Sequence, residues 1–270
     1  MASNQSVMKI RNCLLDFAVA AMLFVLYVRS TPAQATAPPS FQTTETLNYD
    51  VEWSVFTAGR ITVQLVGAER DRPSEIITIA RSQGVASLLY KVQDDYRSLF
   101  DPQTLCSRSI SKKINEGRRH RELDITFKGD EGIAAITDRD LNSPGTTKHV
   151  EKKIPACTED IVTAFYFMRH QPMHVGEPVK FAVNDGGDTV EIDADIQAEE
   201  QVQTPLGSRK ALRVEPKVFG PLYKRKGRLL VWFSDDAEHL PLRLKLTLSV
   251  ATVTATLKSV STGPTVYPGK

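Results

Sequence analysis

The sequence contains few of the residues, and none of the short motifs, that mark common enzymatic or metal-binding sites. Only three cysteines and five histidines occur in 270 residues, and none of them belongs to a C-x-x-C or H-E-x-x-H pattern. The chain also lacks the G-x-S-x-G turn of serine hydrolases and the G-x-x-x-x-G-K loop that cradles phosphate. Because each of these chemistries needs its local pattern, the sequence argues against enzymes of these classes.

A strong excess of charge of either sign is also missing. The formal net charge is +2, which is too small by itself to indicate a nucleic-acid partner. His170 and His174 have an H-x3-H spacing that would suit zinc on one helix, but Pro172 between them should end such a helix. We therefore predict no nucleic-acid partner, no metal site and no cofactor.

Carboxylates occur in close pairs, as a glycosidase requires, but their local geometry does not favour catalysis. The pairs are Asp94 with Asp95, Asp193 with Asp195, and Asp235 with Asp236. Adjacent residues of a strand point to opposite faces, and the face of Asp193 and Asp195 continues with Glu191 and Gln197, as on a solvated surface. We predict no catalytic residue, and a hydrolase is the least supported alternative.

The longest apolar run lies near the N-terminus, from Phe17 to Val28. As a helix these residues span about 18 Å, short of the roughly 30 Å hydrocarbon core of a bilayer. Residues 33–35, Ala-Gln-Ala, have the small-x-small form that a signal peptidase needs. We predict a cleaved signal peptide over residues 1–35 and an exported protein of the periplasm or outer envelope, with no transmembrane segment after cleavage. An uncleaved anchor in the inner membrane is the alternative.

Alternation of apolar and polar residues dominates the rest of the chain. Residues 228–234 and 240–248 alternate with a period of two around a polar bend, which is typical of two antiparallel strands. Similar segments recur along the chain, separated by turn formers at hairpin spacing. We predict a mainly β domain over residues 45–262, a large antiparallel meander that forms a curved sheet or a closed or half-closed barrel. A flexible lead (36–44) precedes it and a tail (263–270) follows.

One segment breaks this pattern and predicts a helix over about residues 158–170. Thr158 is suited to cap its N-terminus, and Pro172 should end it. One face is apolar and consists of Ile161, Ala164, Phe165 and Met168. We expect this helix to pack onto the sheet or to plug it.

Two cysteines remain outside the predicted signal peptide, Cys106 and Cys157. An oxidising compartment would permit a disulfide bond between them. Two cysteines do not make a disulfide framework, so two unpaired buried thiols are the alternative that the sequence favours.

Several motifs, taken in their order, resemble a known family. They are "LNYDVEW" with "AGRITVQL", "DDYRSLFDPQTL", "TEDIVTAFYFMR", "TPLGSRKALRVEP" and "GRLLVWFSDDAEHLPLRLKL". Over about residues 45–260 the chain is similar to the bacterial domain of unknown function 3108 family. The resemblance implies an exported protein with a mostly antiparallel sheet. It implies no activity, because the family has none assigned.

Aromatic and apolar side chains give the leading functional hypothesis, a non-enzymatic envelope protein that binds a hydrophobic or lipid-like ligand or an envelope partner. A curved sheet with a helix across its mouth can leave part of its apolar face as a cavity. The candidate ligand-binding residues are Phe165, Met168, Trp53 and Trp232. The alternative is a structural or assembly factor whose core is filled.

Two basic clusters are the remaining candidates for a site. They contain Lys112, Lys113, Arg118, Arg119 and Arg121 around one hairpin, and Lys224, Arg225 and Lys226 before another. Such clusters could contact anionic headgroups or glycans at an envelope surface. Protection of strand edges by charge explains them equally simply and is the interpretation that we favour.

Overall fold

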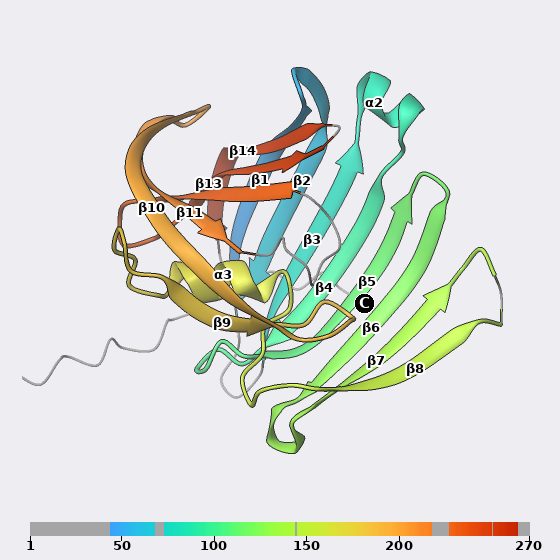
Figure 1. Ribbon diagram of the computed structural model, residues 1–270. Coiled ribbons are helices and arrows are strands. Elements are labelled where there is room, and N and C mark those ends of the chain that lie inside the picture. Colours follow the sequence, from blue (N-terminus) through green and yellow to red (C-terminus); the bar gives the residue numbers. More distant parts are fainter. Residues whose placement is uncertain (1–43, 68–72, 144, 218–226, 250, 264–270) are drawn as a thin grey trace, which may run out of the picture. The chain divides into compact units, whose positions relative to one another are not determined.

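Fourteen antiparallel strands form one sheet in the part of the chain that the computed structural model describes, namely residues 44–67, 73–143, 145–217, 227–249 and 251–263 (Figure 1). The first eight strands are β1 (Thr44–Trp53), β2 (Phe56–Val66), β3 (Ser74–Ser82), β4 (Gln93–Phe100), β5 (Ser107–Glu116), β6 (Arg119–Lys128), β7 (Ile133–Asp140) and β8 (Thr147–Lys153). The last six are β9 (Val179–Val183), β10 (Val190–Thr204), β11 (Gly207–Pro216), β12 (Gly227–Ser234), β13 (Pro241–Leu248) and β14 (Thr252–Gly263).

Strands that follow one another in sequence are neighbours in the sheet, except for β8 and β9. The two halves of the sheet are joined by the pairing of β1 with β14. The sheet runs from β8 down to β1 and then from β14 down to β9. β1 therefore lies in the middle, where Leu47 is opposite Val63 on β2 and Val260 on β14. β8 and β9 form the two edges. The predicted antiparallel meander, curved into an open sheet, is confirmed.

Apolar side chains from alternate residues cover the inner face of the sheet, which we define as the face that contacts helix α3 (Thr163–Arg169). On β12, Val231 and Phe233 are almost fully buried, and their partners on β11 are Val214 and Leu212. The four side chains belong to one cluster that includes Met168 of α3. Burial of this kind contributes roughly 1.5–3 kcal/mol for each large apolar side chain.

α3 is shorter than predicted, and Thr158 does not cap it. The helix begins at Thr163 rather than at residue 158, because the backbone just before it is used elsewhere. The N–H of Glu159 donates to Ala182 O on β9 at 2.8 Å, and its carbonyl accepts from Asn184 N at 2.9 Å. A segment that pairs with a strand edge cannot also form the first turn of a helix.

The same segment also reaches β5, so it links distant parts of the sheet. Thr158 O accepts a hydrogen bond from Ser107 N at 3.2 Å. Beside it, Lys152 at the end of β8 forms an ion pair of 2.7 Å with Asp188, in the turn that follows β9. The β8 end of the sheet is thereby tied to the β9 end through side chains and through the Thr158–Asp160 segment.

A second helix, α2 (Gly84–Leu89), was not predicted. It lies between β3 and β4, which begins at Gln93. Val85, Leu88 and Leu89 of α2 are apolar but exposed, so their apolar character does not indicate a buried strand. A short 3-10 turn, η1 (Gly129–Glu131), joins β6 to β7.

Cys106 and Cys157 form a disulfide bond, with their Cα atoms 5.1 Å apart. The bond connects the residue before β5 to the segment that runs along β9. The structure therefore has the bridge, and the alternative of two unpaired thiols, which the sequence favoured, was wrong. Cys13 lies outside the described residues.

The side chain of Glu159 is buried beside this bond. It is 1% exposed, and its Oε2 has no hydrogen-bond partner among the residues that the structure describes. Burial raises the pKa of this carboxyl from 4.5 to about 8, because the charged form loses its hydration. The neutral acid is therefore the stable form of Glu159 in the folded protein at neutral pH.

Loss of the disulfide bond should lower the free energy of unfolding by about 4 kcal/mol, the chain-entropy value for a loop of 51 residues. Urea unfolding with and without reductant measures the difference. A Cys106→Ser, Cys157→Ser variant should match the reduced protein and should not respond to reductant. Equal stability of the oxidised protein and this variant would contradict the expectation.

The free energy of unfolding should fall as pH rises from about 4.5 to 8, because folded Glu159 keeps its proton over this window and the unfolded side chain releases it. Glu159→Gln should flatten this slope, by an amount on the order of 4 kcal/mol or less. Urea unfolding at the two ends of the window tests this. Glu191→Gln, at an exposed position, should keep the wild-type slope. If Glu159→Gln kept it too, Glu159 would not be the group responsible.

Candidate functional site

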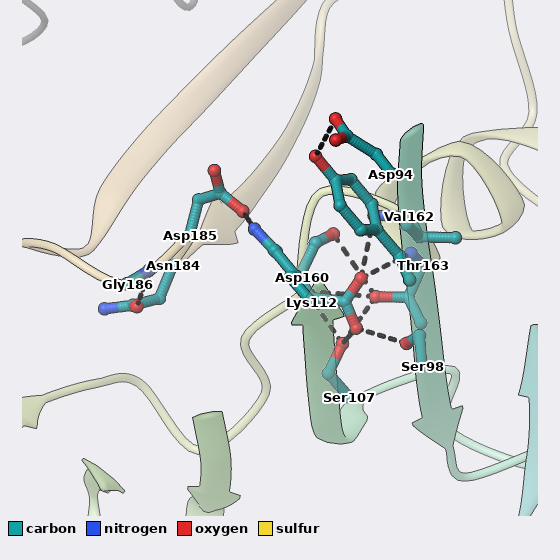
Figure 2. A network of polar contacts seen from close by, with 11 residues as sticks. Asp94, Ser98, Ser107, Lys112, Asp160, Val162, Thr163, Asn184, Asp185 and Gly186 are labelled. Atoms are coloured by element: carbon teal, nitrogen blue, oxygen red, sulfur yellow. Dashed lines mark hydrogen bonds and ion pairs between the residues drawn. The ribbon is translucent and has the colours of Figure 1, made fainter. Parts of the chain in front are cut away.

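The N-terminus of α3 is fixed by the buried carboxylate of Asp160 (Figure 2). Asp160 Oδ1 accepts hydrogen bonds from the backbone N–H groups of Val162 and Thr163, at 2.7 and 3.0 Å. Asp160 Oδ2 accepts from the hydroxyl groups of Ser98 on β4 and Ser107 on β5. The carboxylate, which is fully buried, thus caps the helix and joins it to two strands.

The C-terminal end of α3 is fixed by a buried ion pair. The guanidinium of Arg169 binds both carboxylate oxygens of Glu45 on β1, at 2.6 and 2.9 Å. Both side chains are largely buried, and the guanidinium also lies over the ring of Tyr166. Bidentate geometry compensates part of the cost of removing both charges from water. α3 is therefore held to the sheet at both ends.

A cavity of about 330 Å³ lies between α3 and the inner face of β9–β13. We call α3 together with residues 160–162 before it the α3 segment. This segment contributes Ile161, Ala164, Phe165 and Met168 to the cavity wall. The strands contribute mainly aliphatic and aromatic side chains, among them Phe181, Val214, Val231 and Phe233. Among the residues that line this cavity, Asp185 alone carries a charged side chain. We call this space the larger cavity.

A second cavity of about 200 Å³, the smaller cavity, lies on the other side of the α3 segment. It is lined by inner-face residues of β1, β2 and β13, including Leu47, Ile61 and Leu244. Ile161 and Phe165 line both cavities, so the two spaces flank the same side chains. A single ligand could therefore extend past these two residues.

Polar groups lie at the walls of both cavities. Thr78 lines the smaller cavity, and its buried hydroxyl has no hydrogen-bond partner among the described residues. Tyr96 lines the same cavity, and burial raises its pKa above the ordinary range for a tyrosine. Its hydroxyl donates to Asp94 at 3.4 Å. A buried hydroxyl without a partner is costly, so Thr78 is suited to bind a polar group or a water.

Lys112 on β5, which was predicted to lie at a basic surface, contacts Asp185, a residue of the wall of the larger cavity (Figure 2). It is only 3% exposed, so that assignment was wrong. Its ammonium forms an ion pair with Asp185 and lies 5.5 Å from the centre of the Tyr96 ring. Burial lowers its pKa to about 8. Lys112 points inward because it shares the inner face of β5 with Ile110 and Ile114, which are both buried.

Of the four predicted ligand-binding residues, the structure places two at the cavities. Phe165 lines both cavities and Met168 lines the larger one. Trp53 lies at the end of β1 and is 39% exposed, and Trp232 packs in a core cluster with Val202. Neither tryptophan lines the larger or the smaller cavity.

The other predicted basic residues divide into three groups. Lys113, Arg118 and Arg119 are exposed at or near the tip of the β5–β6 hairpin. Arg121 forms a bidentate ion pair with Asp138 on β7. Residues 224–226 lie outside the described residues.

Within the described part of the chain, one cluster has the spacing of a metal site, consisting of Cys106, Cys157 and Glu159. The two sulfur atoms are bonded to each other and therefore offer no thiolate. This cluster does not fit a metal ion. His170 lies just beyond the end of α3 and His174 in the loop that follows, and the structure does not place them in a common cluster of ligands.

Sequence reasoning missed the strand residues of the cavity walls. Phe181, Val231 and Leu244 share the strand periodicity that predicted the sheet, but periodicity does not indicate which part of an apolar face stays uncovered. The signal that could have narrowed the choice is the length of the helix. Even the helix predicted over residues 158–170, about 20 Å long, is too short to cover the inner face of a large meander.

Comparisons with known proteins agree with this fold. No curated protein matches the chain significantly. A solved structure described as the crystal structure of a beta-barrel-like protein of domain of unknown function DUF1849 from Brucella abortus has a TM-score of 0.57 and 7% sequence identity, covering 83% of this chain and 100% of that chain. At this identity, the likeness shows a common fold alone.

No helix in the described residues combines the length and the hydropathy needed to cross a bilayer. The predicted family resemblance is confirmed. The model of a family described as "Protein of unknown function (DUF3108)" matches residues 48–258, which is most of the domain. The chain belongs to the DUF3108 family.

Proposed function

We propose that this protein is a non-enzymatic binding protein of the bacterial cell envelope, and that it holds a hydrophobic, lipid-like molecule in the cavities beside α3. One observation carries the proposal. Two apolar cavities of about 330 and 200 Å³ share Ile161 and Phe165 as walls. The larger of them is already within the range of small-molecule sites, and both have the mostly apolar lining of such sites.

The exposed apolar side chain of Ile161 supports the same function. It belongs to the α3 segment that packs against the sheet, yet it is 43% exposed, because it borders both cavities. A ligand that covered it would gain about 25 cal/mol for each Å² of apolar surface removed from water. The site is built to gain affinity from hydrophobic contact.

A few polar groups at the walls favour an amphiphilic ligand over a pure hydrocarbon. Thr78, whose buried hydroxyl has no partner among the described residues, lines the smaller cavity, and Asp185, the ion-pair partner of Lys112, lines the larger one. Pockets of this kind use a small number of polar groups to orient an otherwise apolar ligand. The ligand class is therefore a lipid-like molecule with at least one hydrogen-bonding group.

The envelope location rests on two features. The N-terminal apolar run and the Ala-Gln-Ala site are typical of an exported chain. The Cys106–Cys157 bond is the kind of bond that persists in oxidising compartments. Cell fractionation with detection of the N-terminus by mass spectrometry tests export.

Filling the larger cavity should displace the ligand. Native mass spectrometry of the protein purified from its own periplasm should detect a bound lipid-like molecule. Ala164→Phe, which adds a ring at the cavity wall, and Phe165→Asp, which adds a charge, should each reduce the occupied fraction at least tenfold.

The matched control for Ala164→Phe is Ala135→Phe, which makes the same change on β7, away from both cavity walls. It should retain the ligand. Thermal unfolding of each variant verifies that it is folded. A wild-type protein that carries no ligand would favour the alternative of an assembly factor, and unchanged retention in both cavity variants would exclude the α3 cavities as the site.

A further inference from the structure

Two neighbouring turns expose an unusual number of large apolar side chains. The turn between β1 and β2 exposes Trp53, Val55 and Phe56, the last two by 83% and 72%. α2 and its C-cap expose Val85, Leu88, Leu89 and Tyr90, by between 49% and 85%. Contiguous exposed apolar surface of this kind marks an interaction site on a soluble domain.

These two turns lie together at one end of the sheet, at the top of the view in Figure 1. Gln83 N, just before α2, donates to Ala58 O near the start of β2 at 2.8 Å. α2 joins β3 to β4, and β3 is the direct neighbour of β2. We call the exposed side chains of residues 53–56 and 85–90 the apolar rim.

Basic residues border the apolar rim on the side of the β5–β6 hairpin. Lys91 O accepts from Gly117 N at 2.8 Å, and a Cβ atom at Gly117 would lie 2.8 Å from the ring of Tyr90. The next two residues of this tight turn are Arg118 and Arg119, both exposed. The rim and the hairpin tip are therefore in direct contact.

A polar cavity of about 770 Å³ begins at the same tip. Its wall includes Arg118, Arg119 and Lys148, and also Asp138 and Asp140. Asp138 forms an ion pair with Arg121, and Arg119 forms one of 3.4 Å with Glu116. Neither Arg118 nor Lys148 forms an ion pair with another described residue, so these two cations are the best suited to bind phosphate groups.

We propose that the apolar rim and the adjoining basic tip dock this protein on an anionic phospholipid membrane, with the rim entering the interfacial region and Arg118, Arg119 and Lys148 binding headgroup phosphates. Charge and polarity both favour a membrane as the occupant. Residues 53–57 and 83–90 contain no charged residue, so nothing in them opposes entry into the interface. Tryptophan and tyrosine at the border between apolar and basic surface are typical of interfacial anchors.

This docking surface is separate from the α3 cavities, since no residue of the rim or of the basic tip lines either of them. The proposal therefore stands or fails independently of ligand binding in the cavities. If both hold, the cavities would belong to a protein that meets the source of its ligand directly.

Trp53 provides a local reporter for the test. The chain has two tryptophans, so Trp232→Phe leaves Trp53 as the single one. Vesicles of phosphatidylethanolamine and phosphatidylglycerol with brominated acyl chains should quench Trp53 fluorescence, because bromine quenches only a tryptophan that reaches the acyl region. Vesicles of phosphatidylcholine alone should bind at least tenfold more weakly. Co-sedimentation of the wild-type protein with the same vesicles checks that the reporter substitution has not changed binding.

Variants of the rim and of the tip separate the two parts of the surface. Leu88→Asp with Leu89→Asp should weaken binding to anionic vesicles at least tenfold. Arg118→Glu with Arg119→Glu should weaken it by a similar factor and remove the preference for anionic lipid. The controls are Val175→Asp, an exposed apolar residue between α3 and β9, and Lys245→Glu on β13, and both should bind as the wild type does. All variants are compared with the same N-terminus, so the apolar run at residues 17–28 affects them equally.

Three outcomes would overturn the proposal. The first is association with vesicles without quenching of Trp53, which would place the contact elsewhere. The second is equal binding by the Leu88→Asp, Leu89→Asp variant and the wild type. The third is a wild-type dimer in light scattering that this variant converts to a monomer, with no quenching of Trp53, which would make the rim an interface between two copies of the chain.

Discussion

The position of α3 depends on the carboxylate of Asp160. It accepts two backbone N–H groups of the helix and two hydroxyl groups, from Ser98 on β4 and Ser107 on β5. A buried carboxylate without such donors would cost several kcal/mol, so the helix can begin only where all four donors converge. This single group fixes the N-terminal end of α3 relative to the inner face of the sheet.

The cavities follow from that constraint together with the size of the sheet. Fourteen strands with alternating side chains present a broad apolar inner face, and a helix of seven residues covers only a part of it. Because Asp160 and the Glu45–Arg169 ion pair hold both ends of α3, the helix cannot shift sideways to fill the spaces beside it. Apolar cavities that close packing would normally remove are thereby kept open on both sides of Ile161 and Phe165.

The sheet could be predicted from the sequence because its signal is local. The alternation in residues 228–234 and 240–248 predicted the β12–β13 hairpin, and helical spacing placed Phe165 and Met168 on the face of α3 that does contact the sheet.

The start of α3 could not be predicted, because it is set by hydrogen bonds to β9, which is remote in sequence. Lys112 was misplaced although its parity with Ile110 and Ile114 indicated the inner face, because charge was given more weight than periodicity. Strand parity does not reveal where a strand ends, so it could not show that Trp53 is the last residue of β1.

The proposed function requires that the space beside α3 is a binding site rather than a packing defect. The most direct test is a crystal structure of the protein purified from its own cell envelope without removal of lipid. A bound ligand should appear as continuous, elongated density between α3 and β10–β12, in contact with Phe165 and Val231. An empty space, or one closed by the side chains of Ile161 and Phe165, would contradict the proposed function.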